Sequence, residues 1–187
     1  MTPAPDISLD REKLKALVHY VCHRAPEDRL GKTKLNKILY YSDIEAYVAL
    51  GAPITGEVYV KHQYGPVSAH IDEVLEELKA EQALAIAEAS GFHVYSGQRY
   101  RQYRYVSLRR PSVQSFTADE IAIVEETLDD ICQNYTAREI SEASHGLVWQ
   151  SARIGEELPY YTAFSHFVGE INPDDVRWAD QHLASRR

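Results

Sequence analysis

The fold of this chain depends on residues 31–68, which read GKTKLNKILYYSDIEAYVALGAPITGEVYVKHQYGPVS. From Lys32 to Leu50, apolar residues recur at the spacing of one helical face, and a second stripe of tyrosines and aliphatic residues covers the neighbouring face. We therefore expect this helix to pack on several sides and to form the centre of the domain. The polar strip that remains for water consists of Asn36, Lys37, Asp43 and Glu45.

The segment after this helix contains two backbone signals. Gly51 suits the left-handed position that ends a helix. An extended stretch over residues 54–62 then leads to a corner at Tyr64-Gly65-Pro66-Val67. We expect Pro66 to lie in the first turn of the next helix, where its missing N–H group is not needed.

The rest of the chain predicts an α+β fold: a mostly helical single domain around the central helix (about 32–50), with a small antiparallel β-sheet. A helix should begin near Leu9, and alternating residues between 84 and 109 predict two or three strands. Capping boxes at 117–120 and 136–139 each predict a helix start. After His145 the chain reads as a loop. We expect residues 1–8 to be disordered, and residues 9–187 to form one domain with a C-terminal helix at about 173–185.

Composition indicates a soluble, cytoplasmic protein. The chain has 187 residues, of which 44% are hydrophobic and 26% charged, as in ordinary globular domains. It contains no apolar run near the roughly 20 residues that span a bilayer and no signal peptide. Cys22 and Cys132 fall on predicted apolar faces, which favours buried, reduced thiols.

The motifs of common catalytic and metal sites are missing from the sequence. The eight histidines and two cysteines contain no CxxC or HExxH pattern. There is no GxSxG motif, and Gly31-Lys32-Thr33 lacks the upstream glycine of a phosphate-binding loop. We therefore expect no catalytic residues, no metal and no cofactor, and a protein that is not an enzyme.

Charge is distributed unevenly and suggests two contact surfaces. Residues 117–145 contain eight acidic residues and one basic residue, and an acidic helix face would attract a basic protein partner. A strand-like segment at 98–110 interleaves arginines with tyrosines, as in some nucleic-acid-binding sheets. The formal charge of −8 argues against nucleic acid. The candidate partner-binding residues are Glu125, Glu126, Asp129 and Asp130 on the helix, and Arg99, Arg101 and Arg104 on the strand.

Four motifs in order resemble a known family. Residues 34–43, KLNKILYYSD, are similar to its KLxKLLYYAD helix, and residues 51–54, GAPI, to its GxPL step. The YGPV turn at 64–67 also matches, and Ser144-His145 with Trp149 resembles its THxxxW segment, with serine in place of threonine. This family is the SocA-like antitoxins, or Panacea domain, of bacterial and prophage-associated toxin–antitoxin systems. The resemblance extends from about residue 32 to 160.

The resemblance implies an antitoxin that neutralises a cognate protein toxin by direct binding. It implies no binding to a membrane. One alternative is an adaptor that delivers a bound protein to a Clp-type protease, and another is a nucleic-acid-binding module using Arg99–Arg110. The oligomeric state is left open. We expect the shared residues to be architectural, with Trp149 packed on the central helix. These residues are Leu35, Ile38, Leu39, Tyr40, Tyr41, Asp43, Gly51, Tyr64, Gly65, Pro66, His145 and Trp149.

Overall fold

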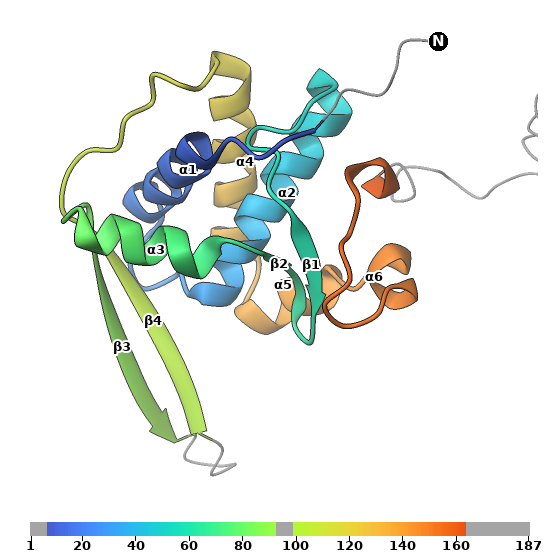
Figure 1. The fold of residues 1–187 in the computed structure, drawn as a ribbon. Helices are drawn as coiled ribbons and strands as arrows, with labels where there is room; N and C mark the ends of the chain where they lie inside the picture. The colour runs from blue at the N-terminus through green and yellow to red at the C-terminus, as the bar shows by residue number, and fades with distance from the viewer. Residues whose placement is uncertain (1–6, 93–98, 164–187) are drawn as a thin grey trace, which may run out of the picture.

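The computed structural model describes residues 7–92 and 99–163 (Figure 1). It confirms a mostly helical α+β fold with two small antiparallel sheets of two strands each. The expected C-terminal helix at about 173–185 lies outside the described residues. The elements in chain order are α1 (Arg11–Arg24), α2 (Lys32–Leu50), β1 (Tyr59–His62), β2 (Gly65–Ser68), α3 (Ile71–Ala80), β3 (Leu84–Phe92), β4 (Arg99–Ser107), α4 (Ala118–Asn134), α5 (Ala137–Ala143), α6 (Leu147–Ser151) and a 3₁₀ turn, η1 (Tyr160–Ala163).

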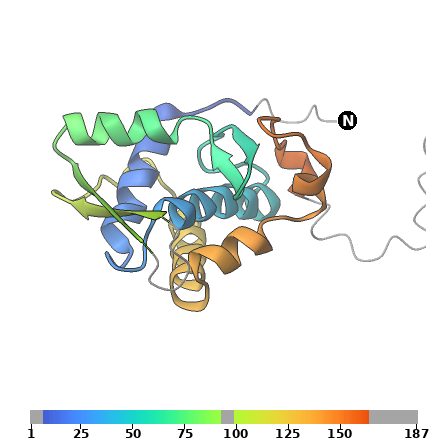
Figure 2. The same ribbon diagram turned by 90° about the horizontal axis from the view of Figure 1, so that it is seen from below.

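Helix α2 is the packing centre, as the sequence predicts. It contacts α1, α4, α5, β2 and η1, and Figure 2 shows it between the β1–β2 hairpin on one side and α4 and α5 on the other. The side chains of Leu35, Ile38 and Leu39 are fully buried. Gly51 ends the helix in the left-handed conformation, with φ of 83°. The helix is therefore enclosed by elements from both halves of the chain.

The polar strip on α2 does not face water, and the sequence interpretation was wrong on this point. Asn36, Lys37 and Asp43 are buried, and only Glu45 of the four is exposed. The β1–β2 hairpin and the segment before it cover the strip, and their polar groups form hydrogen bonds with its side chains. Asn36, for example, accepts a hydrogen bond from the Ser68 backbone N–H at 3.0 Å.

Pro66 lies in strand β2 and not in the first turn of a helix, which corrects a second expectation. It pairs with Lys61 in the antiparallel β1–β2 hairpin, and helix α3 begins only at Ile71. A two-stranded sheet has free edges, where a residue without an N–H group is tolerated. The corner at Gly65 is therefore a hairpin turn that returns the chain along β1.

Other local predictions are confirmed. Both predicted capping boxes are present, before α4 and before α5. The first helix begins at Arg11, two residues after the expected start, and Asp10 caps it by accepting a hydrogen bond from the Lys13 backbone N–H. Strands β3 and β4 pair from Leu84↔Ser107 to Phe92↔Arg99. Both cysteines, Cys22 and Cys132, are free and buried.

The segment after His145 is more ordered than a loop. It forms the short helix α6 and, after a turn, the 3₁₀ segment η1. These elements were not predicted because each is too short to show a periodic pattern. Within the described part of the chain, no helix has the length and apolar composition that a membrane span needs.

Candidate functional site

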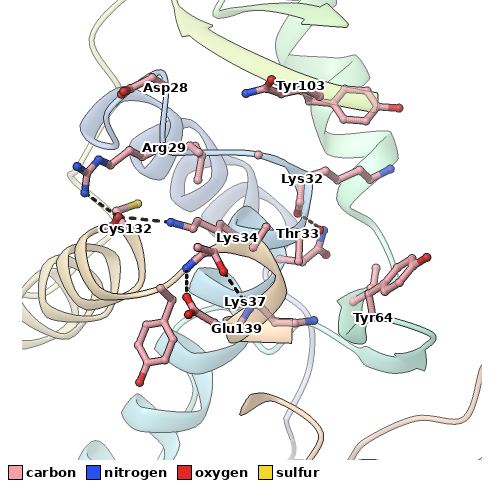
Figure 3. Close-up of a pocket in the computed structure, with 18 of the residues that line it drawn as sticks. Asp28, Arg29, Lys32, Thr33, Lys34, Lys37, Tyr64, Tyr103, Cys132 and Glu139 are labelled. Atoms are coloured by element: carbon pink, nitrogen blue, oxygen red, sulfur yellow. Dashed lines mark hydrogen bonds between the residues drawn. The ribbon is translucent and has the colours of Figure 1, made fainter. Parts of the chain in front are cut away.

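A groove of about 1200 Å³ lies where α2, α4 and α5 meet the β1–β2 hairpin, α3 and β4 (Figure 3). The start of α2 and the residues before it form one wall, and the end of α4 and the start of α5 form another. Tyr64 at the tip of the β1–β2 hairpin, Asp72 on α3 and Tyr103 on β4 also line the groove. The groove thus borders the structural motif of α2 and the hairpin.

Two cations at one side of the groove meet the C-terminal end of α4. Arg29 and Lys34 each donate a hydrogen bond of 3.4 Å to the backbone carbonyl of Cys132. Positive charge is favourable there, because the last carbonyl groups of a helix carry partial negative charge. Arg29 is exposed, whereas Lys34 is only 6% exposed.

Lys37 lies one helical turn further along α2 and is 1% exposed. Its ammonium group donates a hydrogen bond of 2.7 Å to the Pro66 carbonyl, which ties α2 to β2. Burial lowers the pKa of Lys37 to about 7, because the charged form loses its hydration. This lysine therefore contributes both a structural contact and a buried donor beside the groove.

Gly65 permits this close approach of α2 and the hairpin. Its φ of 95° lies in the left-handed region, and a Cβ atom there would overlap the Ser144 hydroxyl and lie 2.6 Å from the Lys37 Nζ. A side chain at this position would thus require both groups to move.

Asp43 forms a second buried polar centre at the other half of α2. Its carboxylate accepts hydrogen bonds from the Thr55 backbone N–H at 2.8 Å, the Thr55 hydroxyl at 2.6 Å and the Tyr59 hydroxyl at 2.7 Å. Burial raises the pKa of Asp43 to about 6, although these hydrogen bonds oppose the increase. The carboxylate holds the segment after Gly51 and strand β1 against α2.

Glu57 and His70 extend this framework. The fully buried Glu57 carboxylate lies 2.9 Å from the His70 ring Nδ1 and accepts a hydrogen bond from the Ala69 backbone N–H. These contacts fix the connection between β2 and α3. Together with the contacts of Lys37 and Asp43, they show that the polar residues of the motif hold the hairpin on the central helix.

Trp149 packs on strand β1 and not on α2, which corrects a further expectation. Its indole N–H donates to the His62 carbonyl at 3.0 Å, and the Lys61 Nζ lies 4.0 Å from its ring centroid. His145 stacks on the same ring at a centroid distance of 3.7 Å. These two residues therefore join α6 to the hairpin.

The acidic residues of α4 divide into two groups. Glu125 is engaged within the protein, since it accepts hydrogen bonds of 2.5 Å from Tyr20 and Arg24 on α1. This pairing lowers the pKa of Glu125. Glu126, Asp129 and Asp130 are exposed, and Asp130 accepts a hydrogen bond from Asn134.

The three candidate arginines lie in strand β4. In the backbone register, Arg99 pairs with Phe92, Arg101 with Ser90 and Arg104 with Ala87. Arg104 itself is exposed.

Sequence reasoning missed Lys34 and Lys37 as candidates. A signal existed, because charged residues in a helix that is apolar on most sides must find buried partners. The described residues contain no group of three or more side chains that could hold a metal ion.

Comparison with protein families supports the resemblance. The sequence model described as antitoxin SocA-like, Panacea domain, matches residues 35–150. This match includes α2 from Leu35 onward, both hairpins, α3, α4, α5 and nearly all of α6. Comparison with curated proteins and with solved structures finds no match. The family match covers more than half of the chain, and the protein therefore belongs to the SocA-like antitoxin family, with a Panacea domain.

Proposed function

We propose that this protein is an antitoxin that neutralises a cognate toxin in the cytoplasm by direct protein–protein binding. The observation that carries the proposal is the family match over residues 35–150. Antitoxins of this kind imply a toxin as partner, and a binding role does not require catalytic groups.

The arrangement of the motif residues supports binding over chemistry. Lys37 and Asp43 are buried and bonded to the hairpin and to the segment before it. Both side chains are used to hold the scaffold, so the toxin must be contacted by residues at the surface. We infer that Lys37 and Asp43 serve the scaffold and do not set the specificity for the toxin.

One candidate contact surface is the exposed acidic face of α4, formed by Glu126, Asp129 and Asp130. Carboxylates at helical spacing would raise the association rate of a basic partner surface. Glu125 contributes less to this face, because Arg24 and Tyr20 already bind its carboxylate.

The test is co-expression with the neighbouring gene in the genome. We expect that gene to stop growth when it is expressed alone, and growth to recover when this protein is also present. The two proteins should then co-purify as a stable complex. A neighbour that is harmless alone, or that never forms a complex with this protein, would refute the proposal.

The alternative to simple occlusion is that this protein, once bound, delivers the toxin to a Clp-type protease. In that mechanism, the toxin half-life would fall when both this protein and the protease are present. Simple occlusion would leave the half-life unchanged or longer. A pulse-chase measurement in strains with and without the protease therefore distinguishes the two.

Nucleic-acid binding through β4 is the less favoured alternative, because the formal charge of the chain is −8. Titration with single-stranded and duplex oligonucleotides at about 50 mM salt tests it, since phosphate contacts are strong under that condition. Binding with a steep salt dependence would support this alternative.

A further inference from the structure

The groove beside α2 has the chemistry of a site for an acidic peptide segment. We propose that it receives such a segment of the toxin, and that Lys34 binds a carboxylate of that segment. This inference rests on the proposed function and adds the site and the chemistry of the partner.

The first argument is the small number of acceptors around Lys34. An ammonium group has three N–H donors, yet the Lys34 side chain, 6% exposed, has one hydrogen bond, of 3.4 Å, to the Cys132 carbonyl. A buried charge needs short bonds and a counter-charge to offset its lost hydration. A carboxylate in the groove would provide both.

Lys37 lines the same groove and is 1% exposed. Its ammonium group bonds to the Pro66 carbonyl on the hairpin, whereas that of Lys34 points to the end of α4 (Figure 3). Lys37 therefore adds positive charge to the opposite wall of the groove and does not share the position of the bound carboxylate. Neither lysine is a surface side chain that water alone satisfies.

The second argument is the net positive charge of the residues that line the groove. The groove is lined by four cations, Arg29, Lys32, Lys34 and Lys37, and by three carboxylates, Asp28, Asp72 and Glu139. Asp72 pairs with Lys32, which leaves three cations and two carboxylates. One of these carboxylates, Glu139, has its pKa lowered by hydrogen bonds from Thr136 and, to a smaller extent, by the charge of Lys34, but it forms no ion pair with Lys34 within 4 Å. The groove is thus locally basic in a chain with a formal charge of −8. This favours an acidic ligand over a basic one.

The third argument is the size and lining of the groove. A volume of about 1200 Å³ exceeds the roughly 300–1,000 Å³ of typical small-molecule sites. Tyr64, which is 61% exposed, and the half-buried Tyr103 and Tyr135 offer aromatic surface around the cations. Tyrosines of this kind are common anchors at protein interfaces. A peptide segment of several residues fits these features better than a lone anion.

The experiment compares full-length variants in binding to the toxin encoded by the neighbouring gene, by calorimetry. Lys34→Met keeps the length of the side chain and removes its charge. We expect Kd to rise at least about tenfold, because bonds to charged groups contribute strongly. Lys79→Met is the matched control, since Lys79 is exposed on α3 and pairs only with Glu76. It should change Kd less than about twofold.

A second variant distinguishes a loss of binding from a loss of folding. Arg29 is exposed at the rim of the groove, so Arg29→Glu should leave the melting temperature nearly unchanged while it weakens toxin binding. Unchanged Kd values in both Lys34→Met and Arg29→Glu would overturn the groove proposal. Tighter binding by Lys34→Met would also overturn it.

An independent probe separates this inference from the proposed function. Fluorescence anisotropy with a labelled hexaglutamate peptide, and with hexaglutamine as control, does not require the toxin. Wild-type protein should bind hexaglutamate, and Lys34→Met should weaken that binding. If the wild-type toxin complex never forms but the peptide result holds, only the proposed function fails. Equal binding of both peptides, or of neither, would refute the groove.

Discussion

Replacement of Gly65 by alanine tests how the hairpin is held on α2. The backbone φ at Gly65 is 95°, and an added Cβ would overlap the Ser144 hydroxyl. It would also lie 2.6 Å from Nζ and 2.8 Å from Cε of Lys37. Both side chains would have to move away from their present acceptors, the Ser141 and Pro66 carbonyls.

The expected loss has two parts. A non-glycine residue in the left-handed region costs about 1–2 kcal/mol. Weakening the buried bond from Lys37 to the Pro66 carbonyl adds about 1.5–3 kcal/mol, since the donor is charged. We therefore expect Gly65→Ala to lower the free energy of unfolding by about 3–4 kcal/mol, a large share of the total stability of a domain of this size.

Gly51→Ala is the matched control for this change. Gly51 has a similar φ of 83°, but nothing lies within 4 Å of the Cβ position. This variant should show the backbone part alone, about 1–2 kcal/mol. Urea unfolding followed by circular dichroism gives both values. Addition of Ser144→Ala to Gly65→Ala should restore part of the loss, because it removes the overlapping hydroxyl.

Equal losses in Gly51→Ala and Gly65→Ala would refute the reasoning, since the neighbours of Gly65 would then contribute nothing. Absence of any rescue by Ser144→Ala would show that the hydroxyl is not the obstacle.

Three further variants test other parts of the structure. Leu39→Ala should lower the unfolding free energy by about 2–5 kcal/mol, because Leu39 is fully buried; a loss under 1 kcal/mol in urea unfolding would contradict its place in the core. The pKa of Asp43 is about 6 in the folded state, against an ordinary value of 3.8. Between these two pH values the folded state therefore binds more protons than the unfolded state. The free energy of unfolding should fall by up to about 3 kcal/mol as the pH rises from 4 to 7. Asp43→Asn should lack that part of the pH dependence, and identical profiles would exclude this role. Reversal of charge at Glu126 and Asp129 should leave the melting temperature nearly unchanged and weaken a basic partner; an unchanged Kd would remove this face from the interface.

Features that depend on neighbouring residues could be predicted from the sequence. The span of α2, the left-handed Gly51 and the two capping boxes each require contacts within about four residues, which periodicity and residue type reveal. The antiparallel strands at 84–107 follow from alternation and a turn signal. The order of the four motifs was sufficient to indicate the family.

The burial of the polar strip on α2 depends on long-range packing and could not be predicted from the sequence. Periodicity shows that Asn36, Lys37 and Asp43 share a strip, but it does not show whether water or protein covers that strip. The partners are 12 to 32 residues away in the chain, among them Thr55, Pro66 and Ser68. A local pattern contains no information on such contacts.

The candidate sites also depend on long-range contacts that the sequence pattern does not reveal. Glu125 looked equivalent to Glu126 in the sequence, but α1 brings Arg24 to it from 101 residues away. Trp149 joined the hairpin because His62 offers a carbonyl from 87 residues away. The groove around Lys34 exists only because the end of α4 meets the start of α2. Long-range packing sets these contacts, and residue spacing alone does not.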